Sequence, residues 1–299
     1  MQESNNHRWW VMAALAVGTF MAPLDGSVVN IVLPQIAGYF QSDLASVEWV
    51  IMSYLLVISS LLLIYGRLGD MYGHKTVYVT GFIIFTLASV LCATAQNLAV
   101  LIAFRVVQAL GAGMMMAIGP AIIAATFPPG ERGRALGLIG STVAAALAFG
   151  PTIGGVLSDY FGWRSVFYIN LPIGIVAITA SSIVLRRSVA TKRQNFDFAG
   201  AGSAFLGLSF LLFALSYGQS WGWRSAGVWA LLIAALILLA TFIFVEKRVP
   251  EPMMDLTLFK SRLFTMANLT SLLNFMAQFS VVFLMPFYLL FYRDNPVLL

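Results

Sequence analysis

Residues 9–35 read WWVMAALAVGTFMAPLDGSVVNIVLPQ, an apolar run whose only charged side chain is Asp25. An α-helix rises about 1.5 Å per residue, so about 20 apolar residues cross a hydrocarbon core roughly 30 Å thick. The run does not alternate apolar and polar residues, as a strand of a membrane barrel would. This stretch therefore predicts a membrane-spanning helix.

Eight further apolar stretches of comparable length follow this first one. They lie at 47–66, 76–95, 98–124, 133–157, 165–185, 198–217, 226–245 and 263–291. The chain is 60% hydrophobic and 10% charged, whereas roughly a quarter of the residues of a soluble domain are charged. So few charges cannot cover the surface of a water-soluble protein. We therefore expect an all-α, multi-pass membrane helix bundle with nine spans.

The basic residues predict the orientation of these spans. When the N-terminus is placed in the cytoplasm, most Lys and Arg residues fall in the inner loops, and the outer loops contain Arg164, Arg224 and Arg293. This asymmetry is what the positive-inside rule describes. We expect a cytoplasmic (inner or plasma) membrane protein whose N-terminus is cytoplasmic. The net charge of +5 is explained in the same way and does not indicate a nucleic-acid partner.

Two charged residues, Asp25 and Arg105, lie well inside predicted spans. A charge at the centre of a spanning helix costs on the order of 3 kcal/mol, so an unpaired ion facing lipid is disfavoured. Both residues lie about 10–15 Å below the outer surface at the helical rise per residue, so they could pair if spans one and four are neighbours. Gln108 shares a helix face with Arg105 and is a candidate cavity-lining residue. Either Asp25 is a protonatable group that Arg105 controls, or the pair is static and only positions helices.

The inner turn at residues 66–75, GRLGDMYGHK, is rich in glycine. Gly66, Gly69 and Gly73 permit tight turning and close backbone approach. Asp70 could bond free N–H groups at a helix N-terminus, where the dipole favours an anion. The alternative is an ordinary short cytoplasmic turn.

Small residues recur every fourth position in the fifth span, at Ala146, Gly150, Gly154 and Ser158. Gly155 adjoins this stripe, and Pro151 favours a kink. Such a stripe allows another helix to approach closely. It serves packing alone or forms a seam between two moving halves.

Polar residues in the ninth span share one face, at Ser271, Asn274 and Gln278. This pattern suits the lining of a cavity, and equally suits hydrogen bonds between helices.

The remaining reactive residue types do not form a site that the sequence can identify. Cys92 is the single cysteine, and the two histidines, His7 and His74, are far apart in sequence. We find no nucleophile–base set, metal-ligand cluster or phosphate-binding loop. We therefore expect neither an enzyme nor a bound cofactor.

Five stretches together resemble one family. They are LDGSVVNIVLP at 24–34, GRLGDMYGHK at 66–75, RVVQALGAG at 105–113, the segment 137–155 that ends in GPTIGG, and GWRSVFYINLPIG at 162–174. In place and order they resemble motifs of the major facilitator superfamily, in particular its fourteen-span drug:proton antiporter branch (the EmrB/QacA type). Ser27, Met71, His74, Ala109 and Ala146 depart from the usual residues of these motifs.

The resemblance implies a domain organisation. Residues 1–190 would form an N-terminal six-helix bundle, 191–250 two linker helices, and 251–299 the start of a second bundle that is C-terminally incomplete. The partner of this chain would then be the missing C-terminal half of the same transporter, in addition to the lipid bilayer.

The resemblance also implies roles for the residues singled out above. Asp25 and Arg105 would act in proton coupling. The gate loop would contain Gly66, Gly69, Asp70, Gly73 and Lys75. The antiporter motif and domain interface would contain Gly137, Gly150, Pro151, Gly154 and Gly155.

The function implied is proton-coupled efflux of lipophilic or cationic small molecules by secondary active transport. Asp25 in mid-membrane favours this reading, because a simple uniporter would not need it. The alternative is a truncated, non-transporting membrane remnant or interaction module that keeps the fold.

Overall fold

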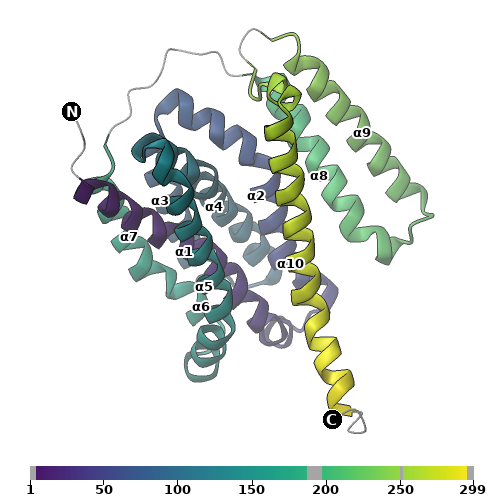
Figure 1. Ribbon diagram of the computed structural model, residues 1–299. Helices are drawn as coiled ribbons and strands as arrows, with labels where there is room; N and C mark the ends of the chain where they lie inside the picture. The colour runs from purple at the N-terminus through teal and green to yellow at the C-terminus, as the bar shows by residue number, and fades with distance from the viewer. Residues whose placement is uncertain (1–4, 187–196, 250–251, 295–299) are drawn as a thin grey trace. The chain divides into compact units, whose positions relative to one another are not determined.

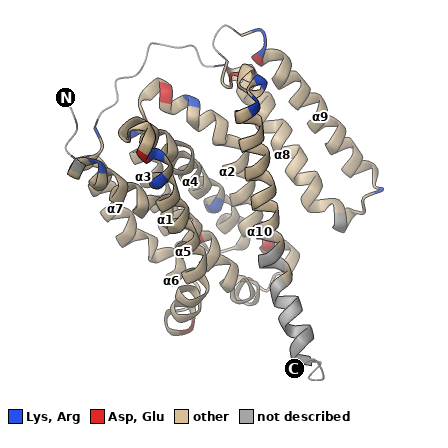
Figure 2. Ribbon diagram, in the orientation of Figure 1, with Lys and Arg blue, Asp and Glu red and all other residues tan. Residues whose placement is uncertain are grey.

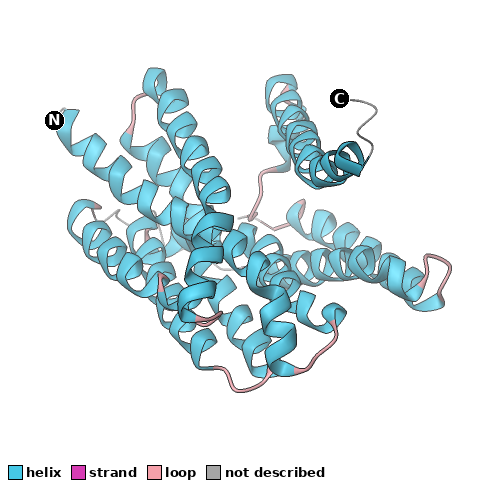
Figure 3. Cartoon of the chain, turned by 90° about the horizontal axis from the view of Figure 1, so that it is seen from below, coloured by secondary structure: helices cyan, strands magenta, loops and turns pink. Residues whose placement is uncertain are grey.

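The computed structural model describes residues 5–186, 197–249 and 252–294, and these form helices joined by short loops (Figures 1 and 3). The expected all-α class is confirmed for this part of the chain. The helices are α1 (Asn5–Phe40), α2 (Leu44–Tyr72), α3 (His74–Thr94), α4 (Leu98–Thr126), α5 (Pro129–Phe161), α6 (Ser165–Tyr168), α7 (Asn170–Val184), α8 (Phe198–Trp221), α9 (Ala226–Glu246), the 3-10 helix η1 (Leu256–Lys260) and α10 (Arg262–Asp294).

Eight helical segments within the described residues are long and apolar enough to cross a membrane. They are α1 to α5, α6 and α7 taken together, α8 and α9, and they coincide with the first eight predicted spans. The ninth predicted span falls on α10, where many side chains lie outside the described part of the chain.

The sixth predicted span, 165–185, is interrupted at Ile169 between α6 and α7. Pro172 follows closely and has no N–H to donate to the carbonyl of Tyr168, so one hydrogen bond of the helix is missing there. Ile169 itself keeps helical angles, with φ −59° and ψ −28°. The chain therefore continues in a helical path with a local fault next to Asn170.

Side chains at the loops determine where several helices begin and end. Asp43 accepts hydrogen bonds from the N–H and hydroxyl of Ser46 at 3.1 and 2.7 Å and so caps α2. The same bonds hold the pKa of the Asp43 carboxyl below its usual value. Asn97 caps α4 by accepting from the N–H of Val100 at 2.9 Å. Gly73 ends α2 with φ +89°, a conformation that favours glycine.

The chain divides into two compact units, Met1–Val245 and Glu246–Leu299. In the first unit α4 packs against α2 and α3, while α1 packs against α5 and α7. The helix α8 packs on α2, where the Trp49 ring stacks on Tyr217 with centroids 5.3 Å apart. The predicted division into a six-helix bundle, two linker helices and a second bundle stays a prediction.

In the second unit, Glu246 accepts hydrogen bonds from the N–H groups of Met253 and Met254 at 3.1 and 3.2 Å. These bonds satisfy backbone donors in the turn before η1.

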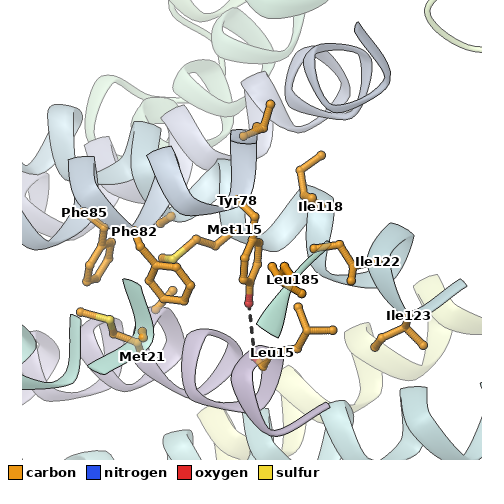
Figure 4. Close-up of a cluster of buried hydrophobic side chains, with 14 of the residues drawn as sticks. Leu15, Met21, Tyr78, Phe82, Phe85, Met115, Ile118, Ile122, Ile123 and Leu185 are labelled. Atoms are coloured by element: carbon orange, nitrogen blue, oxygen red, sulfur yellow. Dashed lines mark hydrogen bonds between the residues drawn. The ribbon is translucent and has the colours of Figure 1, made fainter. Parts of the chain in front are cut away.

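Large apolar side chains fill the space between α1, α3 and α4 (Figure 4). The Tyr78 hydroxyl, buried here, donates to the carbonyl of Leu15 at 3.3 Å. The backbones of α3 and α4 touch at Gly81 and Gly111, because a Cβ on Gly111 would lie 2.5 Å from both the Gly81 carbonyl oxygen and the Phe85 nitrogen. Glycine at position 111 is therefore required for this close approach.

Charged residues of the first unit lie mostly near the ends of its helices (Figure 2). Asp25 and Arg105 are the exceptions that the sequence indicated, since each lies well inside a long helix. The direction in which these helices cross the bilayer stays a prediction.

Candidate functional site

Asp25 lies within α1, two residues after Pro23, and is 1% exposed. Its Oδ2 atom accepts a hydrogen bond from Arg105 Nη1 on α4 at 2.5 Å. The two side chains that the sequence placed at equal depth are therefore in direct contact. Both partners of the ion pair are shielded from solvent, so their attraction is weakly screened.

Arg105 is completely buried and makes several contacts besides Asp25. Its Nε donates to the carbonyl of Val50 at 3.0 Å, and its Nη1 also donates to Gln108 Oε1 at 2.8 Å. The guanidinium carbon lies 4.0 Å from the centre of the Tyr54 ring, a cation–π contact. These groups from α2 and α4 hold the guanidinium independently of Asp25.

Two amides complete the surroundings of the Asp25 carboxyl group. Gln108 Nε2 donates to Asp25 Oδ1 at 2.9 Å, and Asn170 Nδ2 at the start of α7 donates to the same oxygen at 2.7 Å. Asn170 Nδ2 also donates to Ser89 Oγ at 2.9 Å, and Ser89 Oγ donates to the Phe167 carbonyl at 2.8 Å. One network thus connects α1, α3, α4 and α7.

All three side chains bonded to Asp25 are donors, namely Arg105, Gln108 and Asn170. This is the arrangement that an ionised carboxylate requires, because a carboxylate only accepts hydrogen bonds. A proton on Asp25 would meet donors on both oxygens. Protonation must therefore rearrange at least one of these partners.

The predicted gate loop forms the junction of α2 and α3. A Cβ on Gly69 would collide with the Ile118 side chain of α4, whereas one on Gly66 would meet nothing within 4 Å. The Asp70 carboxylate lies 3.4 Å from His74 Nε2. Lys75 Nζ donates to the Ser182 carbonyl in the last turn of α7 at 2.5 Å. The loop thus brings the end of α2 against α4 and fastens the start of α3 to α7; its role as a gate stays a prediction.

The small-residue stripe of α5 faces α1 within the same unit. A Cβ on Gly150 would collide with Ser27, and one on Gly154 would lie 3.1 Å from Val28 Cγ1. Ala146 and Ser158 on the same stripe are buried.

The other residues of the predicted α5 motif lie away from this contact. Pro151 is exposed, and a Cβ on Gly137 or Gly155 would meet nothing within 4 Å. A role for α5 in a domain interface stays a prediction, and it would concern this open side of the helix.

The sequence matches the model of the Major Facilitator Superfamily over residues 15–298. The chain belongs to this superfamily. The helical segments that are long and apolar enough to cross a membrane agree with this assignment.

Curated relatives agree with this assignment. The chain is 38% identical over 283 residues to the riboflavin transporter RibZ of Clostridioides difficile. The matched region covers 94% of this chain and 61% of RibZ. It is 36% identical over 283 residues to the multidrug transporter protein MdtP of Bacillus subtilis, covering 94% of this chain and 52% of MdtP. The chain thus spans about half to three fifths of the length of these relatives.

A solved structure shows the same fold. The bacterial homologue of the human lysosomal transporter Spinster, in an inward-facing and unoccupied conformation, superposes with a TM-score of 0.54 at 19% identity. The match covers 82% of this chain and 64% of that chain.

Several members of the Asp25 network in this Major Facilitator chain were not singled out from the sequence. Asn170, Ser89 and Tyr54 all contact the network and are buried. The sequence does contain a signal for Asn170, namely an amide side chain inside an otherwise apolar span. Ser89 and Tyr54 carry no signal in sequence that separates them from other buried residues.

The two candidate lining residues of the ninth span are not brought to the Asp25 network. Asn274 is exposed on α10 of the second unit. The Gln278 side chain lies outside the described residues. Gln108 does contact the Asp25 network.

Replacing Lys75 with methionine is expected to lower the free energy of unfolding by about 0.3–1 kcal/mol. Its ammonium group bonds a carbonyl at the C-terminus of α7, where a cation is favoured by the helix dipole. Thermal unfolding in detergent measures this effect. Lys75→Arg keeps the charge and should retain most of the stability; equal losses in both variants would contradict the electrostatic explanation.

Proposed function

We propose that this chain is the proton-coupled part of an exporter that exchanges protons for lipophilic or cationic small molecules. The observation that carries the proposal is the buried Asp25–Arg105 pair, which joins two spanning helices and whose carboxylate is surrounded by hydrogen-bond donors. An ionisable residue inside a membrane is costly and usually belongs to a transport pathway or proton relay.

Protonation of Asp25 would act as the switch. The proton neutralises the carboxylate and removes its attraction for Arg105, while the guanidinium keeps the Val50 carbonyl, Gln108 Oε1 and the Tyr54 ring. The α1–α4 contact is then weaker than in the ionised state. Uptake of a proton on one side and its release on the other would bias the helices between two arrangements.

The fourteen-span branch is our proposal for the place of this chain in its superfamily. In support, α8 and α9 form an extra antiparallel pair that follows α7 and precedes α10 (Figure 1). The relatives RibZ and MdtP are longer than this chain. We accordingly propose that a second bundle completes the transporter. Because most Lys and Arg residues then fall in the inner loops, we also propose that the N-terminus is cytoplasmic.

Two observations support the proposed substrate class: the buried carboxylate of Asp25, and the names of the relatives. RibZ is named for riboflavin and MdtP for multiple drugs. A cationic dye and riboflavin are therefore the two probes that discriminate best between a broad cation exporter and a vitamin transporter.

Asp25→Asn is expected to reduce proton-driven dye export to the level of empty liposomes, because an amide cannot bind and release the proton. The full-length natural protein is reconstituted in liposomes, and a pH gradient is imposed while dye movement is followed. Asp159→Asn, an exposed acid at the end of α5, is the matched control and should transport normally. If the unsubstituted protein moves neither probe, and Asp25→Asn changes nothing, the non-transporting alternative holds.

A further inference from the structure

We propose that Asn170 is a positioning residue that responds to the proton on Asp25 by reversing its side-chain amide. This inference rests on the proposed protonation of Asp25. It begins from an unusual feature of Asn170: the side chain is completely buried, yet its Oδ1 atom has no hydrogen-bond partner. A buried amide oxygen without a partner is costly and calls for an explanation.

The two oxygens of Asp25 are not equivalent as positions for a proton. Oδ2 faces Arg105 Nη1, and a guanidinium has donors and no acceptor. Oδ1 faces the amides of Gln108 and Asn170, and a side-chain amide has both a donor and an acceptor end. The proton can therefore find a partner on the Oδ1 side, provided that one amide turns its oxygen toward it.

Gln108 is not the amide that can turn. Its Oε1 already accepts from Arg105 Nη1 at 2.8 Å and lies 3.6 Å from the Cys92 thiol, which donates to it. Reversal would place the Gln108 NH₂ group against the guanidinium, donor against donor. Asn170 has no such commitment, because its oxygen is the end without a partner.

Reversal of Asn170 changes the end of its amide that contacts Asp25 and Ser89 from a donor to an acceptor. With Asp25 ionised, Asn170 Nδ2 donates to Asp25 Oδ1 and to Ser89 Oγ. With Asp25 protonated, the turned Oδ1 accepts the hydrogen bond of the carboxyl proton. It then also faces the Ser89 hydroxyl, which in the arrangement of the structure donates to the Phe167 carbonyl. The change thus involves Phe167 and Asn170, which lie on either side of the interruption at Ile169. The Tyr168 carbonyl there already lacks its helical hydrogen bond, because Pro172 has no N–H.

The titratable groups around Asp25 come from three helices. They are Tyr54 on α2, Cys92 on α3 and Arg105 on α4. The residues that α5 and α7 bring to this part of α1 include Gly150 and Asn170, neither of which titrates. A pH-dependent signal that requires both Asp25 and Asn170 is therefore distinguishable from titration of the other three groups.

Infrared difference spectroscopy between high and low pH tests the proposal on the full-length protein in lipid. Protonation should produce an Asp25 carboxyl band, together with a shift of the Asn170 amide C=O band to lower frequency, since that oxygen gains a hydrogen bond. Asn170→Leu should lose the amide shift and keep the carboxyl band, and Asp25→Asn should lose both. Should Asn170→Leu fail to fold, Asn170→Ser also removes the amide C=O group but keeps a polar side chain at this position.

The control is Ser181→Ala, which removes a buried hydroxyl without a partner from the same helix. It should leave both bands unchanged. A carboxyl band assigned to Asp25 without any amide shift that depends on Asn170 would overturn the inference and leave the proposed function intact. If no carboxyl band depends on Asp25, the proposed function itself is wrong.

Discussion

Replacing Arg105 with methionine is expected to lower the free energy of unfolding by about 3–5 kcal/mol, the usual cost of removing one partner of a buried ion pair. Asp25 would keep two amide donors but lose its countercharge, in a site where it is 1% exposed. The Val50 carbonyl and Gln108 Oε1 would lose a donor at the same time. Methionine fills much of the same volume, so the effect reports mainly charge and hydrogen bonding.

The double variant Asp25→Asn/Arg105→Met separates these contributions. It leaves no uncompensated charge, so it should be more stable than Arg105→Met alone. Arg224→Met, at an exposed position between α8 and α9, is the matched control and should change stability little. Unfolding in detergent or lipid, followed by circular dichroism, measures all three. Equal stability of the single and double variants would show that the buried charge is not what destabilises the protein.

The second large effect is expected at Gly111, where α3 and α4 touch backbone to backbone. Gly111→Ala should lower the free energy of unfolding by about 1–3 kcal/mol, the usual cost of forcing extra volume into a packed interior. The new Cβ would meet the Gly81 oxygen and the Phe85 nitrogen at 2.5 Å and the Phe85 Cα at 2.9 Å. These are backbone atoms, so relief requires the two helices to separate.

Gly140→Ala on α5 is the control for this prediction. A Cβ there meets nothing within 4 Å, and alanine is a better helix former than glycine by about 1 kcal/mol. It should therefore leave stability unchanged or raise it. Thermal unfolding of the two variants side by side measures the difference. A destabilised Gly140→Ala together with a neutral Gly111→Ala would contradict the assigned helix contact.

The sequence predicted the polar centre of the site only as far as charge and depth allowed. Asp25 and Arg105 were recognisable because a charge in an apolar span demands a partner, and Gln108 because it shares the helix face of Arg105. Asn170 was not, because an uncharged amide costs less in a membrane than an ion and its role depends on which helix it faces. The Val50 carbonyl could not be found at all, since every residue has one.

The small-residue stripe of α5 illustrates the same limit. Spacing alone indicated that Gly150 and Gly154 allow a close helix contact, and this contact exists. The structure identifies α1 as the partner, through Ser27 and Val28. Sequence spacing does not contain this choice, because any helix with a matching surface could have occupied the stripe.

By itself, the sequence determined that the chain is helical, where its first eight spans lie, and that Asp25 and Arg105 must be shielded from lipid. These conclusions follow from local chemistry: apolar length, backbone hydrogen bonding and the cost of a charge in hydrocarbon. The tertiary structure alone decided that Asn170, Ser89 and Tyr54 surround the ion pair, and that Lys75 reaches α7. These contacts join residues far apart in the chain, and they depend on how helix surfaces pack rather than on the composition of any one helix.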